Sequence, residues 1–233
     1  FQPGTFLAAN EETRKTFTQD LVLEKRIALE GAVYIDDEVK FNDKFNIRYG
    51  ARLSSFSNIG GTEYGYTKNE NFAPVDSLTV KTVFDQNNIY NTYWGLEPRM
   101  AVSYNVAKMT AVKASYNRTF QYIQQASNTA SAFPTDQWFS SNLNIEPQIA
   151  DQVAVGLFKN FKKGIETSLE VYYKTMQNQI DYRDGAVLVF NEQLDGELLT
   201  GTGQAYGTEL FLSKTEGLTT GFISYTLSKT TRN

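Results

Sequence analysis

The chain has 233 residues and a formal net charge of −4, from 22 lysines and arginines against 26 aspartates and glutamates. This balance argues against a nucleic-acid-binding surface, which normally carries a basic patch. The sequence contains no Cys and no His, which excludes disulfides, thiolate metal sites and histidine-based catalysis. We therefore expect no catalytic residues, no metal site and no cofactor.

The ends of the chain and its hydropathy set further bounds. Residues 1–27 are polar and are expected to form a loop that leads in from an earlier strand. No signal peptide opens the chain, and both ends are expected to be cut points in a longer polypeptide. The longest apolar run, Ala186–Phe190, is too short for a transmembrane helix. Aromatic residues make up 14% of the chain, which fits strands and the aromatic girdles of membrane barrels.

The clearest strand pattern in the sequence lies between residues 41 and 56. From Phe45 onward, apolar and polar side chains alternate at every position, and a period of two is typical of a β-strand. The apolar parity consists of Phe45, Ile47, Tyr49, Ala51 and Leu53. The opposite parity is polar and includes Arg48 and Arg52, so this strand is expected to separate an apolar from a polar environment.

The same alternation recurs and predicts four hairpins. They pair residues 28–39 with 45–53, 96–105 with 110–118, 149–159 with 165–174, and 205–213 with 218–227. Long segments at about 57–93, 119–146 and 175–202 separate them. Compact soluble domains rarely carry loops beyond about 12–15 residues. We predict an all-β fold, an antiparallel transmembrane β-barrel sector of about eight strands with short periplasmic turns and long extracellular loops.

Particular stretches of sequence carry a family resemblance. They include EPR at residues 97–99 followed by SY at 103–104, ASYNRTFQYI at 114–123, and NIEPQIADQ from Asn144. With the rest of residues 34–56, 95–129, 144–161, 169–186 and 203–232, they resemble the barrel of TonB-dependent outer-membrane receptors, in the form found in Bacteroidota. The resemblance covers nearly the whole chain from Ala28 onward.

The resemblance implies a larger protein than this chain. Family members have a barrel of about 22 strands, a plug domain inside it and a TonB box that reaches the periplasm. Residues 28–233 match only about a third of such a barrel, without the plug and the remaining strands. The parent protein would be a non-enzymatic transporter of the cell outer membrane, which imports an extracellular ligand into the periplasm. Its partners would be the plug, TonB, outer-membrane lipid and, for a glycan-type receptor, a surface lipoprotein lid.

Charged residues on the polar parity are the first candidate functional set. They are Arg48, Arg52, Glu97, Arg99, Lys113, Glu166, Glu170 and Glu209. In a barrel this parity faces the lumen, where charges are hydrated or pair with a plug. The functional interpretation is plug docking or a translocation path, and the alternative is a solvated inner wall.

Aromatic residues in or beside the long segments are the second candidate set. They are Tyr64, Tyr66, Trp94, Tyr122, Phe133, Trp138 and Phe139. Among them, Trp138, Tyr122, Trp94 and Phe139 are the candidate ligand-binding residues. Trp94 and Tyr122 flank strands, so the interfacial girdle is the expected position for both. Trp138 lies in the middle of a long segment and is the best candidate for ligand contact.

Other interpretations remain open at this point. The acidic groups Asp36–Glu38 and Asp181 with Asp184 do not match a calcium loop, and the glycines of 201–207 lack the context of a phosphate loop. A soluble β-sandwich that binds carbohydrate would use the apolar parity as a closed core. A complete eight-stranded barrel would also fit the strand count. The ligand could be a siderophore, cobalamin, an oligosaccharide or a peptide.

Overall fold

A computed structural model describes residues 25–68, 74–126, 137–186, 188, 191 and 193–233. Its main feature is one antiparallel sheet with the strand order β1-β2-β3-β4-β7-β8-β9-β10. The strands are β1 (Ile27–Lys40), β2 (Phe45–Lys68), β3 (Pro74–Ala107), β4 (Thr110–Gln121), β7 (Gln148–Phe161), β8 (Ile165–Tyr182), β9 (Leu198–Lys214) and β10 (Gly221–Arg232). The predicted all-β fold of eight strands in four hairpins is confirmed.

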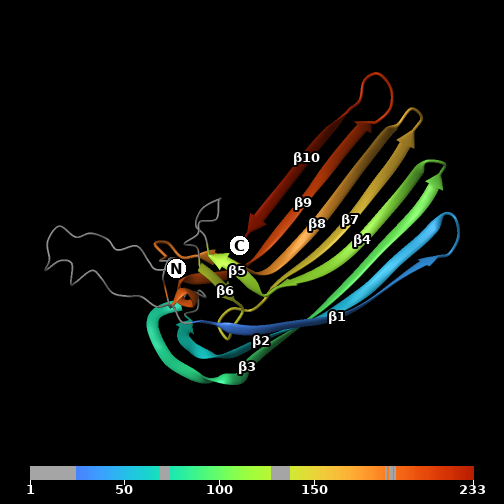
Figure 1. The fold of residues 1–233 in the computed structure, drawn as a ribbon. Coiled ribbons are helices and arrows are strands. Elements are labelled where there is room, and N and C mark those ends of the chain that lie inside the picture. The colour runs from blue at the N-terminus through green and yellow to red at the C-terminus, as the bar shows by residue number, and fades with distance from the viewer. Residues whose placement is uncertain (1–24, 69–73, 127–136, 187, 189–190, 192) are drawn as a thin grey trace.

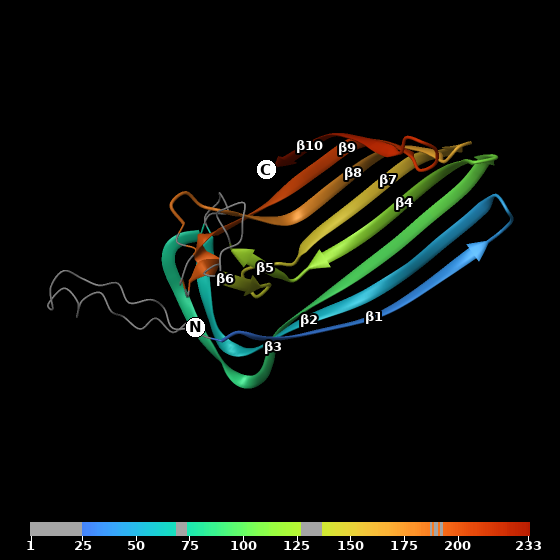
Figure 2. The same cartoon turned by 45° about the horizontal axis from the view of Figure 1, so that its top comes forward.

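The sheet is curved, and its two ends differ (Figure 1). Short turns at 41–44, 108–109, 162–164 and 215–220 lie together at one end, called here the turn end. A two-stranded sheet of β5 (Ile123–Ala126) and β6 (Gln137–Ser140), and the 3₁₀ helix η1 (Leu194–Glu197), gather at the opposite loop end. Figure 2 shows the sheet curved into a trough, with β5 and β6 at the loop end.

The strand register gives the sheet one apolar and one polar face. Tyr49 of β2 lies opposite Met100 of β3, which lies opposite Tyr116 of β4, so these side chains share the apolar face. Arg48, one residue earlier, belongs to the polar face. In β7, Val153, Val155 and Leu157 of the apolar face are each more than 40% exposed. An exposed apolar face fits a barrel wall and contradicts the sandwich, in which a second sheet would bury it.

The sheet is open at both edges. β1 and β10 are the first and last strands of the order and do not pair with each other. The described part of the chain is therefore a barrel sector, and a complete eight-stranded barrel is wrong. Within the same residues, no helix is long and apolar enough to cross a bilayer.

The long segments contain more regular structure than the sequence indicates. β2 and β3 pair well beyond the predicted strands and into the segment predicted as a long loop, from Asn58 opposite Asn91 to Lys68 opposite Pro74, through several register shifts. The segment before β7 contains β5 and β6, and the segment between β8 and β9 contains η1. Backbone groups need partners outside a membrane as well as inside it, and hairpin extension supplies them.

The only hydrophobic core in the described residues lies at the loop end. It consists of Ala126, Phe139, Ile145, Leu188, Leu194 and Leu198. These residues come from β5, β6, the connection to β7, the segment after β8, η1 and β9. The long segments thus pack on one another and hold the loop end together.

Candidate functional site

The polar face carries ion pairs that join β1, β2 and β3. The Arg52 guanidinium lies 3.4 Å from the Glu97 carboxylate of β3 and 3.8 Å from that of Glu30 in β1. The Arg99 Nε lies 3.3 Å from Asp36 Oδ1, although a whole strand separates these two residues. Three predicted charges, Arg52, Glu97 and Arg99, therefore bind neighbours within the wall.

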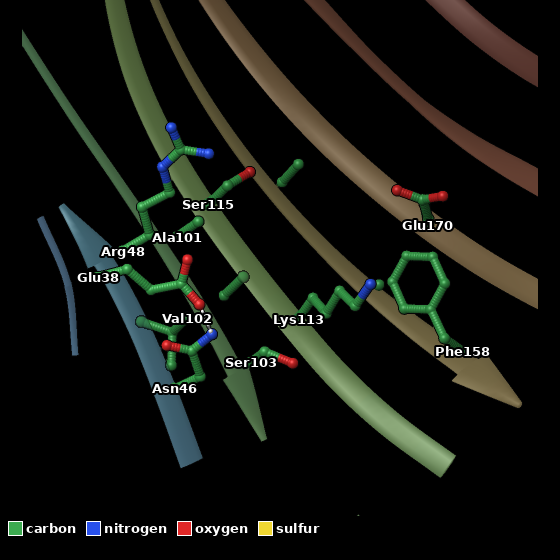
Figure 3. A pocket seen from close by; sticks show the side chains of 13 residues that line it. Glu38, Asn46, Arg48, Ala101, Val102, Ser103, Lys113, Ser115, Phe158 and Glu170 are labelled. Carbon is green, nitrogen blue, oxygen red and sulfur yellow. Dashed lines mark hydrogen bonds between the residues drawn. The ribbon is translucent and has the colours of Figure 1, made fainter. Parts of the chain in front are cut away.

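Nearer the turn end, the polar face forms an open groove of about 410 Å³ (Figure 3). Glu38, Arg48, Lys113 and Glu170 bring two charges of each sign to its lining. None of the four forms an ion pair within the described part of the chain. The Lys113 ammonium instead lies 4.5 Å from the centre of the Phe158 ring. The Glu38 carboxylate accepts a hydrogen bond from Asn46 Nδ2 at 2.7 Å. The groove is therefore a mixed-charge surface whose charges lack an ion-pair partner among the described residues.

Two carboxylates lie side by side on the polar face next to this groove. Glu170 of β8 is directly opposite Glu209 of β9, and directly opposite residues have Cβ atoms about 4.5–5.5 Å apart. Like charges at this spacing repel each other. On the other side of Glu170, Gly156 separates it from Lys113. This row would be stabilised by a cation placed over the two carboxylates.

Tyr122 lies on the polar face and not in an interfacial girdle. Its ring stacks on Phe56 with 5.2 Å between centroids, and its hydroxyl is 2.8 Å from Ser54 Oγ. The Ser54 hydroxyl is also 2.8 Å from Glu97 Oε1. Tyr122 is only 4% exposed. The girdle expectation fails because Tyr122 falls at the break between β4 and β5, where strand alternation no longer fixes side-chain direction.

The other aromatic candidates occupy different environments. Trp94 has the parity of the apolar face and is 66% exposed. Trp138 of β6 is 65% exposed, whereas its neighbour Phe139 is 4% exposed in the loop-end core. Tyr64 is buried. Phe133 lies outside the described residues. Of Tyr122, Trp138 and Phe139, only Trp138 exposes most of its side chain.

A buried polar network at the loop end joins four segments that are distant in sequence. Asp195 of η1 accepts hydrogen bonds from the side-chain amides of Asn142 (2.6 Å) and Asn144 (3.3 Å). Asn144 also donates to the Tyr64 carbonyl oxygen at 2.8 Å. Arg26, just before β1, lies 3.6 Å from Asp195 and 4.0 Å from Glu63. The network thus links the residue before β1, the β2–β3 extension, the β6–β7 connection and η1.

The ionisation of this network follows from its burial. Burial lowers the pKa of Arg26, but the carboxylates of Asp195 and Glu63 more than offset this and raise it. Tyr90 donates a hydrogen bond to Glu63. Burial and then this hydrogen bond raise the pKa of Tyr90 above its ordinary value. The arginine is therefore cationic and the tyrosine neutral at physiological pH.

The local sequence does not indicate this network. Arg26, Glu63, Asn142 and Asp195 are ordinary polar residues in polar segments, and the pairs that touch lie far apart in sequence. No local spacing marks them. Among the described residues, no group of three or more Asp, Glu, His or Cys residues is placed to hold a metal ion.

Comparisons with known proteins give a consistent result. A family model described as TonB dependent receptor-like, beta-barrel, matches residues 4–233. No protein of curated function matches the sequence. The fold is similar to that of the FrpB iron transporter from Neisseria meningitidis, with a TM-score of 0.55, 15% identity and 95% of this chain covered. It is also similar to the alcaligin receptor FauA from Bordetella pertussis and the ferric-catecholate import receptor Fiu from Escherichia coli K12. Each of those two has a TM-score of 0.52, 15% identity and 88% of this chain covered.

These matches cover a small share of the known structures. The chain spans 28% of FrpB, 30% of FauA and 28% of Fiu. At this identity the structural similarity concerns the fold, and the family model, which matches nearly every residue, decides membership. The chain belongs to the TonB-dependent receptor β-barrel family.

Proposed function

We propose that this chain is a sector of an outer-membrane transporter that binds an extracellular ligand and imports it into the periplasm with energy passed through TonB. The observation that carries the proposal is the separation of the two faces of one curved sheet. An exposed apolar face suits contact with lipid. The opposite face carries charged groups that form no ion pair among the described residues of the wall.

The plug domain is the proposed partner of the polar face. A plug must be held in the lumen yet be able to move, and a hydrated wall of mixed charge suits reversible contact. The groove at Glu38, Arg48, Lys113 and Glu170 offers both signs of charge. The adjacent carboxylates of Glu170 and Glu209 favour a basic plug side chain at that position. Arg52, Glu97 and Arg99, which already pair within the wall, are proposed to shape the lumen.

Ligand capture is proposed for the loop end. Trp138 exposes most of its ring there, and a rigid aromatic surface suits stacking on a flat ligand. Trp94 is proposed to anchor the wall at the outer interface. Tyr122 and Phe139 are buried and would support the site from beneath. Since FrpB, FauA and Fiu are named for iron, alcaligin and ferric catecholates, ferric siderophores are the first ligands to test.

The proposal extends to the type of receptor and its surroundings. The motifs of residues 97–104, 114–123 and 144–152 resemble receptors of Bacteroidota. For a glycan receptor of that type, a surface lipoprotein lid would be a further partner, and residues 1–27 would lead in from an earlier strand. A role in transport, and not in catalysis, is part of this proposal, because the family is one of transporters and receptors.

An intact-mass measurement tests the transporter proposal. The polypeptide that carries this sequence should be recovered from a detergent-solubilised outer-membrane fraction. Because the chain spans 28–30% of the known structures, the mass should be about three times 26.3 kDa. A polypeptide of 26.3 kDa recovered from the soluble fraction would contradict the proposal and favour a binding module.

Plug docking is tested by the double variant Glu170→Gln/Glu209→Gln in the full-length receptor. If a basic plug group lies over these carboxylates, the variant should make the plug more sensitive to limited proteolysis. Glu216→Gln is the control variant, because it removes an exposed carboxylate in the turn before β10, away from this pair. Equal proteolysis of all three proteins would exclude a plug contact at this pair.

A further inference from the structure

Four lysines lie close together at the turn end, around the turns that follow β7 and β9. They are Lys159, Lys162, Lys163 and Lys214. The two turns touch, because the backbone N–H of Thr215 donates to the Gly164 carbonyl oxygen at 2.9 Å and the Thr215 hydroxyl donates to the same oxygen at 3.1 Å. The lysines therefore belong to one surface, called here the lysine patch.

The lysines of the patch form no ion pair with any carboxylate of the described residues. Every ion pair between described residues uses an arginine, and no lysine of the patch has a carboxylate within 4.0 Å. Lys159, Lys162 and Lys163 are exposed, and Lys214 is half-buried. Glu216 is the single carboxylate in the two turns. In a chain with net charge −4, this is a local excess of unpaired positive charge.

The strand register places part of this patch on the apolar face. Phe161 lies opposite Ile165, which lies opposite Lys214, so the three side chains share one row of that face. Lys159 lies on the same face, two residues before Phe161, and its ammonium is 4.8 Å from the centre of the Phe161 ring. Phe161 is 43% exposed and Leu218 of the neighbouring turn is fully exposed. Cations and apolar anchors thus alternate where the apolar face ends.

We propose that the lysine patch is a binding site for the headgroup of an anionic phospholipid in the periplasmic leaflet of the outer membrane. The proposal rests on the proposed function, in which the apolar face contacts lipid and the short turns are periplasmic. Lysine stems lie along apolar surface while their ammonium groups reach the headgroup level. Phe161 and Leu218 would contact acyl chains while the lysines bind phosphate, a combination of basic and apolar groups that is typical of membrane-surface sites.

A second set of lysines at the same end provides the contrast. Lys44, Lys108 and Lys113 line a different groove, together with the polar-face residues Ser103 and Asn105. This groove faces the lumen side of the wall, where no bilayer lipid is present. Of these two sets of lysines at the turn end, the lysine patch is the one that lies next to the exposed apolar face.

The test uses the full-length receptor purified in detergent, with native mass spectrometry to count bound lipid at physiological salt. Phosphatidylglycerol and cardiolipin are the anionic probes and phosphatidylcholine is the neutral probe. The variant Lys159→Gln/Lys162→Gln/Lys163→Gln/Lys214→Gln should bind the anionic lipids at least about tenfold more weakly, with phosphatidylcholine unchanged. The control Lys25→Gln/Lys44→Gln/Lys81→Gln/Lys108→Gln removes the same charge elsewhere and should bind like the parent.

An additional variant and an additional probe separate the possible explanations of this result. Lys→Arg at the same four positions preserves charge and should restore binding, which separates loss of the site from misfolding. Equal loss in both Gln variants, or no anionic preference in the parent, would overturn the proposal. Tight binding of glycerophosphoglycerol, the headgroup without acyl chains, would replace the lipid by a soluble phosphodiester. A receptor that is present in the outer membrane but shows no lipid preference leaves the transporter proposal standing.

Discussion

At the scale of single residues, Gly50 shows how the polar face brings separated charges together. Gly50 lies between Asp36 of β1 and Arg99 of β3 in the register, and those two side chains form an ion pair across it. A Cβ at position 50 would lie 2.5 Å from the Ile35 carbonyl oxygen and would also meet the Asp36 carboxylate. The missing side chain therefore allows a contact across a whole strand.

Gly50→Ala should destabilise the wall by about 1–3 kcal/mol, because the new methyl group must displace backbone as well as Asp36. The free energy of unfolding, measured by urea titration of the receptor refolded in detergent, checks this. Gly31→Ala is the matched control on the neighbouring strand, where the nearest atom to a new Cβ is Ser55 Oγ at an ordinary 3.6 Å. Equal effects of the two substitutions would show that the contact across Gly50 has no special role.

The buried tyrosines at the loop end predict a response to alkaline pH. Burial raises the pKa of Tyr66 and Tyr90 well above the value of about 10 of an unfolded tyrosine. A raised pKa in the folded state means that the fold favours the protonated form. This contribution is complete below about pH 10 and is lost as the pH rises above it. Hydrogen exchange of residues 57–66 should therefore accelerate above about pH 10 by more than the intrinsic, hydroxide-catalysed rate of the same amides.

Tyr90→Phe removes one of the two groups and should make this acceleration smaller. The tyrosinate absorbance at 295 nm that appears together with the opening of the loop end should be smaller in Tyr90→Phe than in the parent protein. Ionisation of all tyrosines near pH 10 in the closed protein would contradict the burial argument.

At the scale of elements, alternation predicted the membrane-crossing strands well and the loop end poorly. The alternation of Phe45–Leu53 and its repeats predicted the eight strands. A strand whose two faces meet different environments must alternate apolar and polar side chains at every residue. β5, β6, η1 and the long β2–β3 extension carry no such constraint. The network of Asp195, Asn142 and Arg26 depends on contacts between remote segments, which local sequence does not record.

Candidate residues divide in the same way. Register confirmed that Arg48, Arg52 and the other charges of the polar parity share one face, since parity is set by the strand itself. Tyr122 lies at a strand break, and its side chain is on the polar face instead of in the expected lipid-facing girdle. Their roles in plug docking and ligand contact stay predictions.

Asp195→Ala should loosen the loop end as a unit. The substitution removes the acceptor for Asn142 and Asn144 and the counter-charge of Arg26, and should cost about 1–3 kcal/mol locally. Hydrogen exchange should accelerate in residues 141–146 and 194–198 but not in the strands near the turn end. Asp184→Ala, at an exposed position of the same long segment, is the control and should leave exchange unchanged. If the exchange rates of residues 141–146 and 194–198 were the same in Asp195→Ala and Asp184→Ala, the linking role of Asp195 would be contradicted.

At the scale of the whole molecule, the account depends on the opposite environments of the two faces. Val155 and Ala154 are neighbours in β7 and belong to opposite faces. Val155→Lys should cost about 2–4 kcal/mol if this position lies near the bilayer midplane, whereas Ala154→Lys enters the lumen and should cost much less. Refolding into lipid vesicles measures both free energies. A similar cost for the two substitutions would contradict the assignment of the faces.

The most direct test of that central claim is an accessibility scan along β7. Because this chain contains no Cys, nitroxide labels can be attached through single cysteines at positions 152–157 without background labelling from this sector. In reconstituted receptor, positions 153, 155 and 157 should collide mainly with oxygen dissolved in lipid, and positions 152, 154 and 156 with a water-soluble nickel chelate. Equal access of the nickel chelate to both sets would show that the apolar face meets water, and the barrel-sector account would be wrong.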